Sequence, residues 1–230
     1  MKACVPVMAL LVWLLALPSM AADQPTIPQD DPKQMLQVVT SELLALSKAA
    51  SAYADNDRER YYQEVEAILN DVVDMDYFSR SVMATYGSSR LYKSLKTDAE
   101  RAAFRQRISD FSKAMRRVLL AKYADALLAF AGERIELSDV TSVAGRDDKA
   151  TLEQTIYDQN NQTYLVQYSL YKKQNKWLVY NVIVEGMNLG GIYRTQFADA
   201  VEKNGGNVDY VVTNWVELMA KQQDTEQQKP

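Results

Sequence analysis

The sequence predicts an α+β domain in which helices pack on a curved antiparallel sheet of about four strands. Two observations lead to this class. Apolar side chains recur at helical spacing through residues 32–131 and again through 190–222, whereas residues 133–186 are rich in β-branched and aromatic side chains. Short polar turns separate the expected strands, and such turns join antiparallel neighbours. Helices followed by strands and more helices are typical of helices layered on one sheet.

Three helices are expected first. The first runs from Pro32 to about Asp55, with its apolar positions on one stripe. Asp57 suits the N-cap of a second helix, because its carboxylate can accept hydrogen bonds from free backbone amides. A shorter helix covers residues 76–86, and residues 87–96 are expected to form a loop.

A long helix is expected next. It starts at the capping box of Thr97 and Glu100, runs toward Ala131 and ends at Gly132. One side of this helix is apolar, and it carries Phe104, Ile108, Phe111, Met115, Leu119 and Tyr123. That side therefore faces other parts of the fold.

The strands are expected at residues 133–145, 149–158, 162–173 and 176–186, before two closing helices at about 190–203 and 207–222. One face of the third strand carries Tyr164, Val166, Tyr168 and Leu170. The fourth strand is apolar on both faces, with Trp177, Val179 and Ile183 on one and Leu178, Tyr180, Val182 and Val184 on the other. Such a strand is covered on both sides, or one of its faces lines a cavity.

The two ends of the chain set the domain boundaries. Residues 1–21 have the features of a cleaved export signal, since Lys2 precedes an apolar run and Ser19-Met20-Ala21 is a small-x-small cleavage site. Residues 22–34 are expected to be a flexible lead-in, 35–222 a single domain and 223–230 a disordered tail. The mature protein is therefore expected to be periplasmic or secreted.

Composition excludes several kinds of site. The chain has 230 residues and no histidine, which removes His-ligated metal sites and Ser-His-Asp or Cys-His catalysis. The single cysteine, Cys4, lies in the expected signal, so thiol chemistry and structural zinc are not expected. The formal net charge of −4 is not the basic surplus of a nucleic-acid-binding protein. We expect no metal, no cofactor and no nucleic-acid partner.

Polar clusters offer weak candidates. The aspartates within residues 71–76 and Asp147-Asp148 lie at a helix end and in a turn, where solvated charge is the simpler interpretation. Arg116, Arg117 and Lys122 form a basic group on the long helix, which is either a solvated face or a contact for an anionic head group. The 14 tyrosines suit a pocket for an amphipathic ligand as well as ordinary core use.

A resemblance to a known family enters at the end of the sheet. The run Val182 to Leu189, followed by Tyr193, Arg194, Gln196 and Phe197, resembles the most recognisable stretch of the MlaC family of periplasmic phospholipid-binding, "toluene tolerance" proteins. Weaker likenesses occur in the same order at residues 76–78, 122–127 and 176–182. Asn188 stands where the family often has serine, and the 87–96 segment also departs from the family pattern.

The resemblance implies a carrier and not an enzyme. Its fold would be similar to a cystatin- or NTF2-like half barrel, with acyl chains held between helices and sheet. The implied ligand is a phospholipid, shuttled between outer and inner membranes to maintain outer-membrane lipid asymmetry. The implied partners are an inner-membrane MCE-domain ABC transporter complex and an outer-membrane lipoprotein complex.

An apolar cavity between the two layers is then expected to bind lipid. Its expected lining residues are Phe104, Ile108, Phe111, Met115, Leu119, Tyr123, Tyr164, Val166, Tyr168, Tyr180, Val182 and Val184, with Met187, Leu189 and Tyr193 near one end. The residues alone leave the other face of the last strand, with Trp177, Val179 and Ile183, as an alternative wall.

Two other functions stay open on the sequence. An enzyme on an NTF2-like scaffold would act on a hydrophobic small molecule with an aspartate base and tyrosine donors, which requires a carboxylate buried in the pocket with a raised pKa. A protein-binding module would instead have a filled core and no cavity of several hundred Å³.

Overall fold

The computed structural model describes residues 27–128, 134–158 and 160–227, and the expected signal at 1–21 and Gly132 lie outside them. The predicted α+β class is confirmed, because eight α-helices pack with an open antiparallel sheet within this part of the chain. The helices are α1 (Pro32–Ala50), α2 (Arg58–Leu69), α3 (Met75–Met83), α4 (Ser89–Ser94), α5 (Asp98–Leu128), α6 (Leu189–Lys203), α7 (Val208–Thr213) and α8 (Trp215–Gln227), with a 3-10 turn η1 (Ala84–Gly87) after α3.

The sheet has six strands, where about four were expected. They are β1 (Arg134–Leu137), β2 (Thr141–Val143), β3 (Arg146–Tyr157), β4 (Thr163–Lys173), β5 (Lys176–Val184) and β6 (Met187–Asn188). Their order is β1-β3-β4-β5-β6, and β2 also pairs with β3. The first expected strand, 133–145, is two strands because β1 and β2 pair with successive parts of the longer β3. The additional strand β6 forms a short hairpin with β5.

Several expected helical boundaries differ from the structure, and α1 itself ends at Ala50, before the expected end at about Asp55. Residues 87–96 contain α4, because the Ser88 hydroxyl accepts a hydrogen bond from the Leu91 amide and caps a short helix. The single expected helix at 207–222 is instead α7 and α8, interrupted at Asn214, whose side chain donates to the Tyr210 carbonyl. Helix α8 then continues to Gln227, beyond the expected boundary at residue 222.

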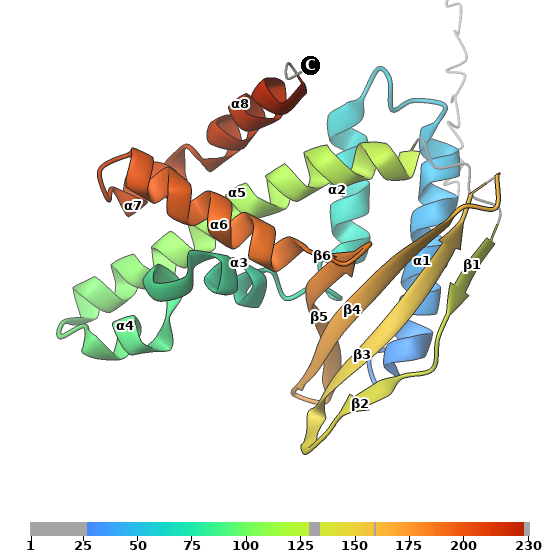
Figure 1. Cartoon of the computed structure of the whole chain (residues 1–230), viewed down its shortest axis with the longest axis horizontal. Helices are drawn as coiled ribbons and strands as arrows, with labels where there is room; N and C mark the ends of the chain where they lie inside the picture. The colour runs from blue at the N-terminus through green and yellow to red at the C-terminus, as the bar shows by residue number, and fades with distance from the viewer. Residues whose placement is uncertain (1–26, 129–133, 159, 228–230) are drawn as a thin grey trace, which may run out of the picture.

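The helices form two groups around the long helix α5. Figure 1 shows α1 and α2 on the side of the molecule that carries the sheet, and α4, α6, α7 and α8 on the other side of it. We call the buried apolar cluster between α3, α5, α6, α7 and α8 the helical core; Phe111, Phe197 and Trp215 are at its centre, with ring centroids 4.9–5.7 Å apart. A second cluster, the sheet core, joins the start of α1 to β3, β4 and β5.

One irregularity in β5 decides which of its side chains face inward. Leu170 of β4 pairs with Val179, whereas the preceding Ser169 pairs with Asn181, so Tyr180 is an extra residue without a partner on β4. A bulge of this kind reverses the alternation of faces along a strand. Val179 therefore lies on the inner face before the bulge, and Val182 and Val184 lie on the same face after it.

The turn after β5 explains the Glu-Gly pair in the family-like segment. Glu185 and Gly186 have φ of 50° and 76°, and they lie between the paired residues Val184 and Met187. Two consecutive left-handed residues form the tight hairpin turn that matches the twist of antiparallel strands, and glycine adopts this conformation without strain. The chain is thereby returned at once to begin α6.

Candidate functional site

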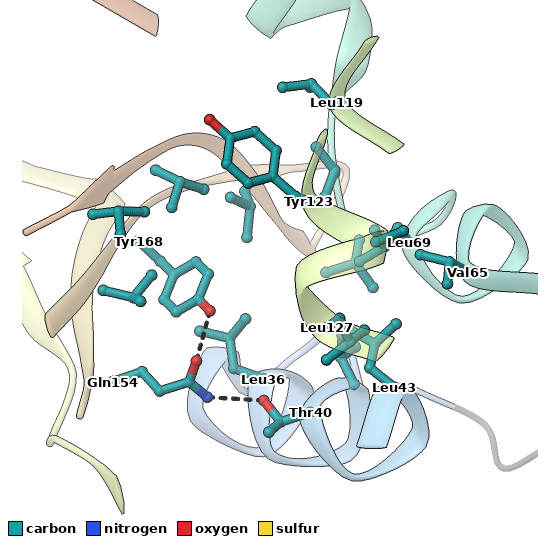
Figure 2. Close-up of a pocket in the computed structure, with 18 of the residues that line it drawn as sticks. Leu36, Thr40, Leu43, Val65, Leu69, Leu119, Tyr123, Leu127, Gln154 and Tyr168 are labelled. Atoms are coloured by element: carbon teal, nitrogen blue, oxygen red, sulfur yellow. Dashed lines mark hydrogen bonds between the residues drawn. The ribbon is translucent and has the colours of Figure 1, made fainter. Parts of the chain in front are cut away.

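A cavity of about 950 Å³ lies between the helices and the inner face of the sheet. This volume is at the upper end of the range for small-molecule sites in proteins. Its walls come from α1, α2, the second half of α5 and strands β3, β4 and β5, and Figure 2 shows several of these side chains pointing into it. Because its lining is mainly apolar, the cavity suits a hydrophobic ligand and not a charged one.

The helical wall consists mainly of aliphatic side chains, with one tyrosine, from three helices. Leu36 and Leu43 project from α1, Val65 and Leu69 from α2, and Leu119, Tyr123 and Leu127 from α5 (Figure 2). These positions recur at spacings of four or seven residues, one or two helical turns, so each helix turns one stripe toward the cavity. Several of them are only half-buried, because their side chains meet empty space where a core residue would meet neighbours.

The sheet wall depends on the bulge in β5. Val166 and Tyr168 of β4 lie opposite Val184 and Val182 of β5, and all four line the cavity. If Tyr180 were paired with β4 in a regular register, with no bulge, the inner positions after Val179 would be Asn181 and Ile183. The bulge therefore places valines on the inner face at the point where the sheet curves around the cavity.

The alternative wall named in the sequence analysis is thus only partly inward. Val179 lines the cavity, and Trp177 is buried in the sheet core. Ile183 is on the opposite face from Val182 and Val184. Tyr180 borders the cavity, but its ring packs against Tyr77 and Tyr171, with centroids 5.0 and 5.8 Å away.

A buried polar relay crosses the inner part of the cavity wall. The Tyr168 hydroxyl donates to Gln154 Oε1 over 2.8 Å, and Gln154 Nε2 donates to Thr40 Oγ1 over 2.9 Å, as the dashed lines in Figure 2 mark. The relay ties β4 to β3 and to α1, and its hydrogen bonds compensate part of the cost of burying polar groups. Burial raises the pKa of Tyr168 to about 12, so its hydroxyl is protonated at physiological pH.

Charged side chains occur only toward the ends of the lining, among the described residues. At one end Arg116 of α5 contacts Glu66 and Asn70 near the end of α2. At the other end Asp158 Oδ1 accepts hydrogen bonds from the backbone amides of Asn160 and Gln162, in the turn between β3 and β4. The acidic lining residues therefore hold structural contacts, and the pocket aspartate required by the enzyme hypothesis is placed in a turn.

The structure brings together nine of the fifteen residues expected to bind lipid. Those on the cavity wall are Leu119, Tyr123, Tyr164, Val166, Tyr168, Tyr180, Val182, Val184 and Leu189. They come from the second half of α5, from β4 and β5, and from the first residue of α6.

Six expected residues lie elsewhere. Phe104, Ile108, Phe111 and Met115 are buried in the helical core, and Tyr193 is buried there against Phe78. The first half of α5 passes beyond the sheet, where α3, α7 and α8 cover it and Phe197 of α6 packs on Phe111, so the same apolar stripe faces solid packing there. Met187 follows the β5 turn and is 56% exposed. The expectation that one wall extended along the whole of α5 is corrected accordingly.

Sequence reasoning also missed part of the wall. No lipid contact was expected from α1, α2 or β3, whereas Leu36, Leu43, Val65, Leu69 and Gln154 line the cavity. Leucine stripes that face a cavity and those that face a core have the same pattern, so no sequence signal could separate them. Gln154 did carry a sequence signal, because it is a polar residue on the strand face that also carries the apolar Leu152.

No helix within the described ranges combines the length and apolar character that crossing a bilayer requires.

The MlaC protein family model matches residues 37–217 of the chain. The toluene tolerance protein ttg2D of Pseudomonas putida is 30% identical over 221 residues, which cover 96% of this chain and 94% of that protein.

A phospholipid-binding protein from Ralstonia solanacearum, solved in complex with a phospholipid, superposes with a TM-score of 0.65. It is 22% identical, and the match covers 83% of this chain and 98% of that one, which shows a shared fold. The family match spans the helical wall, the sheet and the two-residue turn at Glu185-Gly186. The chain belongs to the MlaC family.

Proposed function

We propose that this protein binds a phospholipid with its acyl chains in the cavity between helices and sheet. The observation that carries the proposal is the cavity of about 950 Å³ with its mainly apolar lining. The solved relative from Ralstonia solanacearum holds a phospholipid, and its chain is matched almost completely by this fold. Expected lipid contacts are the nine wall residues named above, together with the leucines of α1 and α2.

The proposed role is transfer and not chemistry. Each CH₂ group exposed to water costs about 0.8 kcal/mol, so a free diacyl lipid crosses an aqueous gap very slowly. An apolar cavity removes most of that cost, and no covalent step is needed. The acidic lining residues Glu66 and Asp158 are engaged at the ends of the cavity, which argues against a general base within it.

We further propose that the carrier works in the periplasm and moves glycerophospholipids between outer and inner membranes, maintaining outer-membrane lipid asymmetry. Its partners would be an inner-membrane MCE-domain ABC transporter complex and an outer-membrane lipoprotein complex. Family membership and the export signal expected at residues 1–21 support this location. Purified from a periplasmic extract, the protein should begin at Ala22; a chain that keeps residues 1–21 would contradict export with cleavage.

Lipid binding can be tested by filling the cavity. Val166→Trp places an indole into the cavity, while Gln167→Trp places it on the outer face of the same strand. Delipidated mature protein is titrated with a phospholipid that carries a pyrene-labelled acyl chain. Val166→Trp should bind at least tenfold more weakly than the wild type, and Gln167→Trp should bind like the wild type.

Circular dichroism must show that both tryptophan variants are folded, because overpacking costs about 1–3 kcal/mol. If Val166→Trp does not fold, Val182→Phe is a smaller substitution on the same wall. A folded, cavity-filled variant that binds the lipid as well as the wild type would contradict the proposal.

A further inference from the structure

The basic group on α5 separates into different environments in the structure. Arg117 is exposed and faces Glu59, and Lys122 is exposed beside the ring of Tyr123. Arg116 alone of the three lines the cavity, and it is the one lysine or arginine among the described lining residues. An otherwise apolar cavity thus has a single cation at its wall.

The guanidinium of Arg116 is held through one of its three nitrogens. Its Nη1 donates to Glu66 Oε1 over 2.7 Å and to Asn70 Oδ1 over 2.9 Å. Within the described chain its Nε and Nη2 donate to no protein acceptor, and the side-chain amide nitrogen of Asn70 is also without one. The free donors of a planar guanidinium fork match two oxygens of a phosphate.

This part of the cavity wall is also reached by solvent. The Arg116 side chain is 28% exposed, Glu66 is half-buried and Asn70 is exposed. Leu69 directly precedes Asn70, and Leu119 lies about one helical turn after Arg116 on α5. Both leucines line the apolar interior of the cavity. A polar opening therefore adjoins a surface that suits acyl chains.

We propose that Arg116, supported by Asn70, binds the phosphate of a phospholipid head group at this opening. The proposal rests on the proposed lipid-binding function and adds the orientation of the ligand. The acyl chains enter past Leu69 and Leu119, and the phosphodiester stays at the partly hydrated end. At the other end of the cavity Asp158 would repel a phosphate, so the charges favour one direction of insertion.

Glu66 provides a second test of the proposal, because its carboxylate and the phosphate would interact with the same Arg116 guanidinium. A half-exposed ion pair contributes little to stability, so Arg116 can share its charge with a second anion. The carboxylate holds the guanidinium in place but lowers its attraction for a phosphate. Removing the charge of Glu66 should therefore strengthen phosphate binding, whereas removing that of Arg116 should weaken it.

The test uses delipidated mature protein and three probes measured by calorimetry: dioctanoyl phosphatidylglycerol, dioctanoylglycerol and inorganic phosphate. Arg116→Gln should weaken phosphatidylglycerol binding about tenfold, the loss of one charge-assisted interaction. Glu66→Gln should strengthen it several-fold. Dioctanoylglycerol has no phosphate, so its affinity should change less than twofold in either variant. Arg117→Gln, the matched control on the same helix, should leave all three unchanged.

The remaining outcomes are decisive as well. Equal effects of Arg116→Gln on both lipids would make Arg116 a structural residue and overturn the proposal, as would a weaker affinity for phosphatidylglycerol in Glu66→Gln. Inorganic phosphate bound more tightly than phosphatidylglycerol, in a way that depends on Arg116, would identify a site for free phosphate instead. If the wild type binds neither lipid, the proposed lipid-binding function is wrong. If it binds both lipids but the affinities do not depend on Arg116 or Glu66, only the proposed phosphate site is wrong.

Discussion

Tyr168 and Gln154 are diagonal neighbours on adjacent strands, and the Tyr168 hydroxyl donates to Gln154 Oε1 over 2.8 Å. Tyr168 lies opposite Leu152, and Gln154 lies opposite Val166. The pair continues through Gln154 Nε2 to Thr40 on α1. These hydrogen bonds form a polar link between the sheet and the helical wall of the cavity.

Breaking this relay on one side should cost more than replacing it. Tyr168→Phe leaves Gln154 Oε1 without its donor, and a buried unsatisfied polar group costs about 1–3 kcal/mol. The combination Tyr168→Phe, Gln154→Leu and Thr40→Val removes the whole relay and should be closer to the wild type in free energy of unfolding. Urea unfolding of the delipidated proteins measures both. If the triple variant is less stable than Tyr168→Phe, the hydrogen bonds of the relay contribute more to stability than the avoidance of unpaired buried polar groups.

Two apolar residues of α5 should respond differently to truncation. Phe111 is fully buried in the helical core, so Phe111→Ala should destabilise the protein by about 3–5 kcal/mol. Leu119 already faces the cavity, so Leu119→Ala removes fewer contacts and should cost less than about 2 kcal/mol. Thermal or urea unfolding distinguishes the two. Equal losses would indicate that the void beside Leu119 is filled by protein.

Gly190 is expected to be intolerant of a side chain. Its amide donates to Asn181 Oδ1 over 3.1 Å, and an added Cβ would lie 2.7 Å from the same oxygen. Gly190→Ala should therefore destabilise the protein by about 1–3 kcal/mol through overpacking. Combining it with Asn181→Ala should recover part of this loss, since the clashing atom is removed.

Gly191→Ala is the control for the same turn of α6. The nearest atom to a Cβ there is 3.7 Å away, in Asn188, so the substitution should be neutral or slightly stabilising. If Gly190→Ala and Gly191→Ala are equally stable in urea, the contact with Asn181 does not constrain the start of α6.

The pH dependence of stability should be flat near neutrality and fall at high pH. The chain has no histidine, and burial raises the pKa of Tyr168 to about 12 from about 10 in the unfolded chain. The folded state keeps this proton more firmly, so its stabilising effect is complete below pH 10. It is lost between about pH 10 and 12, at up to about 1.4 kcal/mol per pH unit for one proton.

Burial also raises the pKa of Tyr193, which adds to the same trend. Unfolding free energies at pH 7, 9 and 11 test the sign, and Tyr168→Phe should show a smaller fall above pH 10 than the wild type. Stability that rises from pH 9 to 11 would contradict burial of these hydroxyls.

The parts of the fold that sequence could predict are those set by local pattern. Apolar spacing identified α1, α2 and α5, and alternation with polar turns identified β3, β4 and β5. Glu185-Gly186 was recognised as a family-like segment, and the structure supplies the reason in its two left-handed residues. The elements that were missed are short: α4, β6 and the break at Asn214 each depend on one or two local hydrogen bonds.

The lining of the site was predictable only in part, because a cavity forms where neighbouring elements leave an apolar face uncovered. Phe111 and Leu119 belong to one apolar stripe of α5, yet α6 and α8 cover the first and nothing fills the space beside the second. Likewise, one unpaired residue at Tyr180 decides which valines of β5 face inward. Both features come from contacts between elements distant in sequence, which periodicity does not encode.

The central claim, that the space between helices and sheet holds a phospholipid, is tested most directly by native mass spectrometry of the mature protein from a periplasmic extract. The wild type should carry an added mass equal to a phospholipid, identified by lipid extraction, and folded Val166→Trp should be free of it. A wild type that is ligand-free under gentle conditions, and that takes up no phospholipid when one is added, would contradict the account.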